Sequence, residues 1–289
     1  TYDARCINMI DSLIKDNHQV TIISETASNN LFQLHNSFTN KEIILPKNGI
    51  LRYYKFHQII KKKLNQIKFD ILIACDIFSL AAVSKYYNQK KIIYDNREIY
   101  SQLHAHKNKP LYKYFWKNFE KYYIKYTNII LFTADSDKKY LSKIYPIINQ
   151  KKLSVIYNYP KYSPLSYNKN IRKHFNLSSK TKIILYQGVI QSGRGIKKLI
   201  HVIKSLNNVV AVCVGDGENL KEYIHLVDKL NLNNKFFFTG KLPYTQILQY
   251  ASDADLGWLI INKKSKSNEL ALPNKFFEYL LMGLPVLSN

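Results

Sequence analysis

The segment KIILYQGVIQSGRGIKKLI (residues 182–200) contains the three parts of one βα unit. Its first part, residues 182–188, is apolar and β-branched and predicts a buried strand, and helical periodicity begins at about Ile196. The loop between them contains three glycines, among them Gly188 at the end of the strand, which let the backbone approach a ligand closely. Arg194 adds a fixed set of donors that suits phosphate, next to the free N–H groups of a helix N-terminus. The segment therefore predicts either an anion-binding loop or an ordinary strand-to-helix turn.

The same order of strand and helix recurs along the chain. Strands are predicted over residues 19–24, 70–75, 90–95, 128–133, 152–157, 182–188, 209–217, 235–240, 255–260 and 285–288. Strands that alternate with helices predict an α/β fold with parallel sheets. Because most of these strands are apolar at nearly every position, we expect both faces of each sheet to be covered.

A segment rich in Pro, Tyr, Ser and Asn, residues 158–170, interrupts this alternation and predicts an interdomain linker. We therefore expect two doubly wound, Rossmann-like domains, over residues 1–160 and 161–289. Ligands bind beyond the carboxyl ends of the strands in open parallel sheets. Two such domains facing each other predict a binding site in the cleft between them.

Composition and charge narrow the classes of protein. The 289 residues are 46% apolar, which excludes a disordered chain, and no apolar run reaches the ~18 residues of a membrane-spanning helix. Three widely spaced cysteines suit a reducing compartment such as the cytoplasm. The formal net charge of +23 permits nucleic acid, an anionic membrane or phosphorylated small molecules as partners. No recognised nucleic-acid-binding module accompanies this charge, so nucleic acid is not predicted as a partner.

The C-terminal segment ALPNKFFEYLLMGLPVLSN (residues 271–289) predicts a second anion site. Pro273 favours the start of a helix, whose first residues, Asn274 and Lys275, offer N–H groups and a cation. Glu278 lies on the same face, about 5 Å deeper. A nucleoside diphosphate needs such a pair, donors for its phosphates and a carboxylate for its ribose hydroxyls. The alternative is an ordinary pairing of Glu278 with Lys275 on a solvated surface. We expect a different, apolar face to contain Phe277, Leu280, Leu281 and Leu284.

The motifs YQGVIQSGRG, VGDGENL, FTGKLPY and LPNKFFEYLLMGLPVLS follow one another from about residue 182. In order and spacing this set resembles the donor domain of family-four glycosyltransferases, which have the GT-B fold. In the N-terminal half, IIYDNREIY resembles the family's strand with an Asp-x-His-Glu type motif. The resemblance implies a nucleotide-sugar donor domain over residues 161–289 and an acceptor-side domain over residues 1–160. It also implies metal-independent transfer of a hexosyl group to an acceptor hydroxyl, with retention at the anomeric carbon and with no cofactor, since the nucleotide sugar is a substrate.

The resemblance also assigns roles to individual residues. It places Arg194 where a basic residue grips the donor diphosphate, and Glu278 where the second glutamate of a Glu-x7-Glu motif holds the ribose. Three further parts of the donor site are expected. Gly188 ends the strand, and Asn274 and Lys275 form the helix tip that meets the phosphate or the sugar. The backbone near Lys241 and Leu242 borders the base. The candidates on the acceptor side are Arg97, Glu98 and His104.

Three positions depart from the family pattern. The first glutamate of Glu-x7-Glu would be residue 270, which is Leu270, with Glu269 one residue away. Val189 stands where a second basic residue is common, and Arg97 replaces the histidine of the N-terminal motif. No side chain is therefore predicted as catalytic. By comparison with the family, we also expect the chain to lack the first strand and the last helices.

Two alternatives to a glycosyltransferase remain open. A nucleotide-sugar epimerase of the same fold would isomerise the donor with no acceptor present. A non-catalytic, glycosyltransferase-like subunit is favoured by Leu270 and Arg97.

Two spacings raise the question of a metal ion. Asp253 and Asp255 form Asp-x-Asp directly before a core strand, where a capping and strand-entry role is expected. His104 and His106 form His-x-His, but no further ligand cluster accompanies them. We therefore predict no metal site.

A lysine recurs at every fourth residue of KPLYKYFWKNFEKYYIKYTN (residues 109–128), and aromatic residues fill the other helical positions. One interpretation is a core-facing apolar stripe with a solvated basic back. The other is peripheral attachment to the anionic inner face of the cell membrane, where a lipid-linked acceptor is available. The segment RYYKFHQIIKKKL (residues 52–64) offers a second surface of this kind. The second interpretation suits an enzyme of bacterial surface polysaccharide or glycolipid synthesis.

Overall fold

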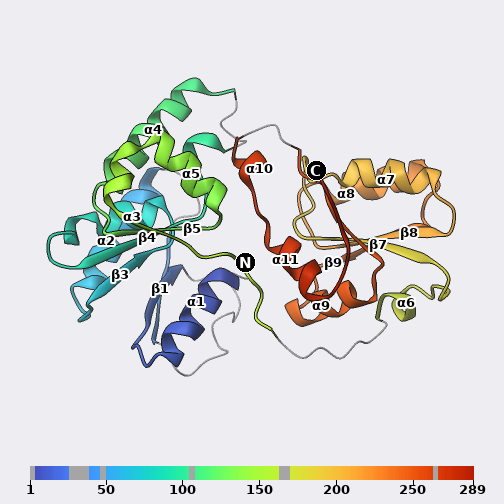
Figure 1. Cartoon of the computed structure of the whole chain (residues 1–289), viewed down its shortest axis with the longest axis horizontal. Helices are drawn as coiled ribbons and strands as arrows, with labels where there is room; N and C mark the ends of the chain where they lie inside the picture. Colours follow the sequence, from blue (N-terminus) through green and yellow to red (C-terminus); the bar gives the residue numbers. More distant parts are fainter. Residues whose placement is uncertain (1–3, 26–38, 46–49, 104–107, 163–169, 263–265) are drawn as a thin grey trace. The chain divides into compact units, whose positions relative to one another are not determined.

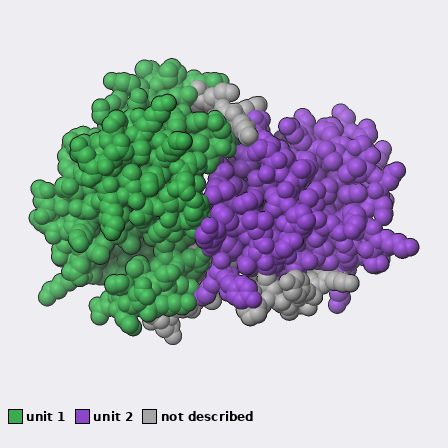
Figure 2. Space-filling model, in the orientation of Figure 1, with its two compact units in different colours: residues 1–158, 265–270 green, residues 159–264, 271–289 purple. Residues whose placement is uncertain are grey.

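The computed structural model describes residues 4–25, 39–45, 50–103, 108–162, 170–262 and 266–289. The chain divides into two compact units, residues 1–158 with 265–270 and residues 159–264 with 271–289 (Figure 2). The prediction placed all of residues 161–289 in the second domain, whereas the short helix α10 (Lys266–Leu270) belongs to the first unit. Leu270 packs against the core of that unit, and its carbonyl oxygen accepts a hydrogen bond from Ser136 Oγ at 3.3 Å.

The first unit contains a four-stranded parallel sheet in the order β3-β4-β5-β6. A separate parallel pair, β1-β2, includes a strand that was not predicted, β2, whose sequence TNKEI lacks an apolar run. The strands are β1 Thr21–Glu25, β2 Thr39–Ile43, β3 Ile71–Ala74, β4 Lys91–Asn96, β5 Ile129–Phe132 and β6 Lys152–Val155. The helices are α1 Ala4–Lys15, α2 Ile50–Leu64, α3 Ile77–Val83, α4 Pro110–Ile124 and α5 Asp135–Ile144, with short 3-10 turns η1 Ser84–Tyr86, η2 Tyr100–Gln102 and η4 Pro146–Gln150.

Helix α4 presents its aromatic residues on two sides. Trp116, Phe119 and Tyr123 pack against the core of the first unit, as the core-facing interpretation expects. A second group of residues is exposed to solvent: Leu111, Tyr112, Tyr114, Phe115 and Tyr122. The core-facing interpretation is therefore wrong for this second group. The helix has too many aromatic positions to bury them all, because it packs against the unit along one side only.

The second unit contains a five-stranded parallel sheet in the order β11-β10-β7-β8-β9. The strands are β7 Lys182–Gln187, β8 Val209–Val214, β9 Phe236–Gly240, β10 Leu256–Leu259 and β11 Val286–Ser288. The helices are α6 Asn170–His174, α7 Ile196–Ser205, α8 Leu220–Lys229, α9 Tyr244–Asp253 and α11 Asn274–Leu281. All ten predicted strands are therefore present, and the predicted α/β class with two Rossmann-like domains is confirmed.

Helices cover both faces of this sheet, as the apolar strands require. Alternate residues of β7 point to opposite faces: Ile183 and Leu185 join a core that includes α9 and α11, whereas Ile184 and Tyr186 join a core with α7 and α8. Figure 1 shows α7 and α8 on one side of β7 and β8, and α9 and α11 on the other. Because the chain adds β8 and β9 on one side of β7 and then β10 on the other, the topological switch point lies at β7. Within the described ranges, no helix is long and apolar enough to cross a membrane.

Candidate donor-binding site

The loops that follow β7 and β8 meet backbone to backbone at the switch point. Gly188 N donates a hydrogen bond to Val214 O at 2.9 Å. Gly215 has a φ of +140°, and a Cβ added there would lie 2.0 Å from Gly188 O. A Cβ added at Gly217 would lie 2.2 Å from Ile190 O. Glycine is therefore required at both positions, and main-chain atoms form the carboxyl end of this part of the sheet.

The loop that contains Arg194 is fixed by hydrogen bonds to the neighbouring strand β10 and its extension. Asn262 N donates to Gly193 O at 2.7 Å, and Trp258 Nε1 donates to Gly195 O at 3.2 Å. Gly195 precedes α7 with a φ of +75°, so the chain turns directly into the helix. The half-buried Arg194 donates to the Gln191 amide oxygen, from Nε at 3.1 Å and from Nη2 at 3.2 Å, with the amide oriented to accept. Arg194 is thus held beside the N–H groups of the α7 N-terminus.

Lys275, on the first turn of α11, is buried against Tyr186 of β7. Its Nζ lies 3.9 Å from the centre of the Tyr186 ring, and the residue is only 9% exposed. Burial and, to a smaller extent, the positive charge of Arg194 together lower the pKa of Lys275 to about 7, while Cys213 and Glu278 oppose the shift. An anion bound between Arg194 and Lys275 would stabilise the ammonium form.

Glu278 lies one turn farther along α11 and is 8% exposed. Its Oε2 accepts a hydrogen bond from Gln187 Nε2, at the last residue of β7. The alternative in which Glu278 and Lys275 pair on a solvated surface is therefore wrong, because both side chains are buried. The predicted apolar face is also wrong in part, since Leu280 is 53% exposed and Tyr279 is buried in its place.

Tyr279 fixes α11 to β7. Its hydroxyl donates to Leu185 O at 3.1 Å and accepts from Gln187 N at 3.0 Å, beyond the end of the pairing between β7 and β10. The ring lies against Gly257, where an added Cβ would be 2.5 Å from a ring carbon. The buried tyrosine therefore completes the hydrogen bonding of the strand and attaches this turn of α11 to it.

The structure thus brings four predicted residues to the switch point: Gly188, Arg194, Lys275 and Glu278. Asn274 is half-buried at the start of α11. Lys241 is exposed and Leu242 packs partly into the core, directly after β9. Gly215 N donates to Gly240 O at 2.9 Å, so the end of β9 adjoins the loop after β8.

Three residues of this region were not predicted: Tyr186, Gln187 and Tyr279. A polar residue that ends an apolar strand run was the available signal for Gln187. No pattern distinguished the two tyrosines from the other 21 in the chain, which has 23 in total.

The predicted acceptor-side residues follow β4 in the first unit. Asp95 is fully buried and accepts from Arg5 Nε at 2.9 Å and from Arg97 Nε at 2.6 Å. Arg97 is therefore fixed by its neighbour, whereas Glu98 is exposed. His104, like His106, lies outside the described residues.

The buried Glu120 of α4 holds η2, the turn that follows Arg97 and Glu98 in the chain. Its Oε1 accepts from Tyr100 N at 3.0 Å, and its Oε2 accepts from Tyr145 Oη at 2.7 Å. Burial raises the pKa of this carboxyl to about 7.

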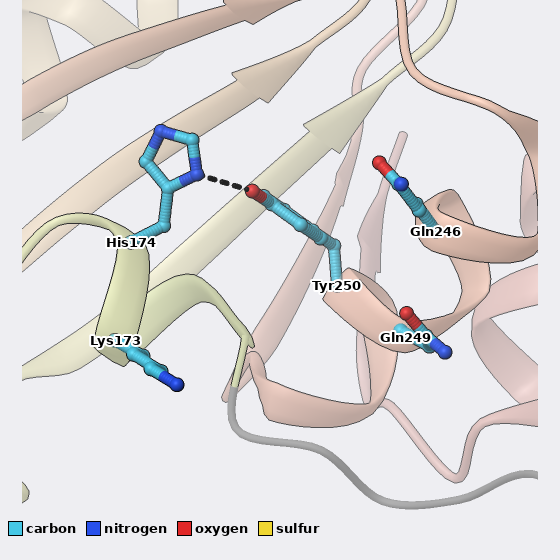
Figure 3. Close-up of a pocket in the computed structure, with 5 residues that line it drawn as sticks. All are labelled: Lys173, His174, Gln246, Gln249 and Tyr250. Atoms are coloured by element: carbon cyan, nitrogen blue, oxygen red, sulfur yellow. Dashed lines mark hydrogen bonds between the residues drawn. The ribbon is translucent and has the colours of Figure 1, made fainter.

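A shallow hollow of about 520 Å³ lies between α6 and α9 and is lined by Lys173, His174, Gln246, Gln249 and Tyr250 (Figure 3). Within it, His174 Nδ1 and Tyr250 Oη are hydrogen-bonded at 3.0 Å. Nearby, Arg172 bonds to Asp255, which also accepts from Ile183 N at the start of β7. The hollow therefore adjoins the amino ends of the strands, opposite the edge where parallel sheets bind ligands.

The capping and strand-entry role expected of the Asp-x-Asp pair is divided between its two members, with Asp253 at a helix start and Asp255 at a strand start. Asp253 accepts from Arg172 N at 3.0 Å at the start of α6, and Asp255 accepts from Lys182 Nζ at 2.8 Å. In the part of the chain that the structure describes, no group of three or more His, Cys, Asp or Glu side chains could hold a metal ion.

Comparison with known proteins identifies the class. The sequence model of Glycosyltransferase Family 4 matches residues 4–159, and that of Glycosyl transferases group 1 matches residues 168–289. The chain belongs to this family, the group 1 or family-four glycosyltransferases, and has their GT-B fold.

Two solved structures show the same fold. Sucrose-phosphate synthase from Thermosynechococcus elongatus has a TM-score of 0.76 and 15% sequence identity, over 97% of this chain and 73% of that one. The HepE protein of Anabaena, in complex with UDP and glucose, has a TM-score of 0.69 and 16% identity, over 99% of this chain and 76% of that one.

An uncharacterized glycosyltransferase of Methanocaldococcus jannaschii is 24% identical over 177 residues. The match covers 58% of this chain and 41% of that relative, so it spans less than half of the relative's length.

Proposed function

We propose that this protein transfers a hexosyl group from a nucleoside diphosphate sugar to an acceptor hydroxyl, with retention at the anomeric carbon. The observation that carries the proposal is the grouping of Arg194, Lys275 and Glu278 around the end of β7. The two cations and the α7 N-terminus suit the diphosphate, and the carboxylate suits the ribose hydroxyls. The bound UDP and glucose of the HepE protein, which has the same fold, support a uridine diphosphate hexose as the first donor to test.

The chemistry follows from where charge develops. As the bond between the sugar and the diphosphate breaks, negative charge grows on the leaving phosphate oxygen. Donors fixed before the reaction stabilise that charge without reorganisation. Here Arg194, the Lys275 ammonium and the α7 N–H groups supply them, so we propose catalysis without a metal ion or a cofactor.

We further propose that the acceptor is lipid-linked and that the protein attaches peripherally to the inner face of the cell membrane, from the cytoplasm. Helix α4 exposes Leu111 at 80%, Tyr114 at 70% and Phe115 at 54%, and Lys117 and Lys121 on the same helix are also exposed. Apolar and basic groups that are exposed together match the acyl boundary and the anionic head groups of such a membrane. This surface supports a role in bacterial surface polysaccharide or glycolipid synthesis.

The proposal is tested by incubating the protein with a panel of nucleotide sugars, with and without a lipid extract as acceptor. Release of nucleoside diphosphate that depends on the acceptor supports a transferase, and the anomeric configuration of the product tests retention. Interconversion of two nucleotide sugars without an acceptor would support the epimerase alternative. Nucleotide binding without either reaction would support the non-catalytic subunit.

A further inference from the structure

Gln187 makes two contacts with consecutive residues of α11. Its backbone N–H donates to Tyr279 Oη at 3.0 Å, and its side-chain Nε2 donates to Glu278 Oε2. Gln187 is 2% exposed, so solvent does not compete for either hydrogen bond. The last residue of β7 therefore determines both where α11 lies and how the Glu278 carboxylate is oriented.

The two contacts have different consequences. The Tyr279 hydroxyl also donates to Leu185 O, so Tyr279 would still link α11 to β7 if the Gln187 side chain were replaced. The side-chain amide of Gln187 makes one hydrogen bond, from Nε2 to the Glu278 carboxylate. Its Oε1 accepts no hydrogen bond from any residue that the structure describes. A buried acceptor without a partner destabilises the folded state.

The amide orientation explains this arrangement. If the amide were turned over, Oε1 would face the carboxylate oxygen and repel it, so only the observed orientation lets the Gln187 side chain donate to Glu278. An apolar residue of similar size would remove the unpaired Oε1, but it would also take the amide donor away from the buried Glu278 Oε2. The amide therefore orients the Glu278 carboxylate through Nε2, while its Oε1 has no donor among the residues that the structure describes.

We infer that Gln187 is a positioning residue for donor binding. It holds the Glu278 carboxylate in the orientation that accepts the ribose hydroxyls of a nucleoside diphosphate. This inference rests on the proposed function, in which Glu278 contacts the donor and Gln187 acts only through Glu278.

Isothermal titration with UDP and with UDP-glucose tests the inference on four proteins: the parent, Gln187→Met, Glu278→Gln and the double variant. Methionine has a similar size and no donor. We expect Gln187→Met to weaken binding by about tenfold, the effect of one lost bond to a charged group. The double variant should bind no more weakly than Glu278→Gln alone, since residues that act through one contact are not additive.

Turnover and stability separate positioning from a structural role. In release of nucleoside diphosphate, Gln187→Met should raise KM for the donor and leave kcat within roughly threefold, because a ribose contact is distant from the reacting bond. Its thermal midpoint should fall by no more than a few degrees, because the substitution removes the unpaired Oε1 together with one donor to Glu278. Tyr279→Phe is the matched control: it should lower the thermal midpoint and weaken UDP binding less than Gln187→Met does.

The outcomes are distinguishable. Parent-like binding by Gln187→Met, or additive effects in the double variant, overturns the inference and leaves the proposed function standing. If the folded parent protein binds neither UDP, UDP-glucose nor any other nucleotide sugar of the panel, the proposed function fails and the inference fails with it.

Discussion

The Lys275 Nζ lies 3.9 Å from the centre of the Tyr186 ring, and Lys275 is the only lysine among the described residues that is buried. The aromatic face partly compensates for the lost hydration of the ammonium group. It does so incompletely, since burial and the nearby Arg194 lower the pKa of Lys275 to about 7. The protein thus keeps a titratable cation at the end of β7, and its charge depends on whether an anion is bound.

Donor affinity should therefore depend on pH through Lys275. Because a bound diphosphate favours the ammonium form, binding takes up a proton above a pH of about 7 and weakens as the pH rises. With that pKa, the affinity for UDP should fall roughly tenfold between about pH 6 and about pH 8. Titration calorimetry against Lys275→Met separates this from the titration of UDP itself. A ratio of the two affinities that stays constant with pH would contradict the prediction.

The same shift gives a stability prediction. The unfolded chain binds a proton at Lys275 up to its usual pKa of 10.5, whereas the folded protein loses it near 7. Between these values the unfolded state holds more protons, so the free energy of unfolding should rise with pH, relative to Lys275→Met. Urea unfolding of both proteins at several pH values measures the difference. A difference that falls over this range would show that the lysine is charged in the folded protein.

Arg194→Ala should weaken binding of nucleoside diphosphates roughly 10- to 100-fold, the effect of removing a charged donor from phosphate. The same substitution should change binding of the uncharged sugar alone very little. Lys204→Ala is the matched control, since Lys204 is exposed at the other end of α7. Equal losses in the two variants would indicate a general effect of net charge.

Gly215→Ala should destabilise the second unit by more than about 2 kcal/mol, because it combines backbone strain with an overlap. The φ of Gly215 is +140°, and the added Cβ would lie 2.0 Å from Gly188 O. Gly283→Ala is the control, since its φ is +68° and no atom lies within 4 Å of the added Cβ. Gly283→Ala should lower the free energy of unfolding by about 1 kcal/mol, the cost of the backbone strain alone. Similar denaturation midpoints for the two variants would rule out close packing of the loops.

Substitution of the exposed apolar residues of α4 should reduce membrane binding. In co-sedimentation with vesicles that contain an anionic lipid, a Leu111→Ser and Phe115→Ser double variant should bind several-fold less than the parent. Ile224→Ser is the control, because Ile224 is 40% exposed on the second unit. Binding that is insensitive to both anionic lipid and salt would contradict attachment through a basic surface.

The order of strands, helices and glycine loops could be predicted because it depends on local pattern. Every predicted strand is present, since each is an apolar run bounded by polar residues or glycine. β2 was missed because its sequence, TNKEI, has no such run; among the described residues it pairs with β1 alone. The capping and strand-entry roles of Asp253 and Asp255 were also predictable, from their place directly before β10.

Much of the candidate site could not be predicted, because it depends on which residues from distant parts of the chain are buried together. By itself the sequence determined the α/β fold and placed Gly188 and Arg194 after a strand and Glu278 on a helix. Only the tertiary structure decided that Lys275 is buried against Tyr186, that Gln187 holds Glu278 and that aromatic residues of α4 remain exposed. The reason is physical: periodicity fixes which face of an element a residue occupies, whereas burial, pKa and hydrogen bonding depend on the neighbour that covers that face.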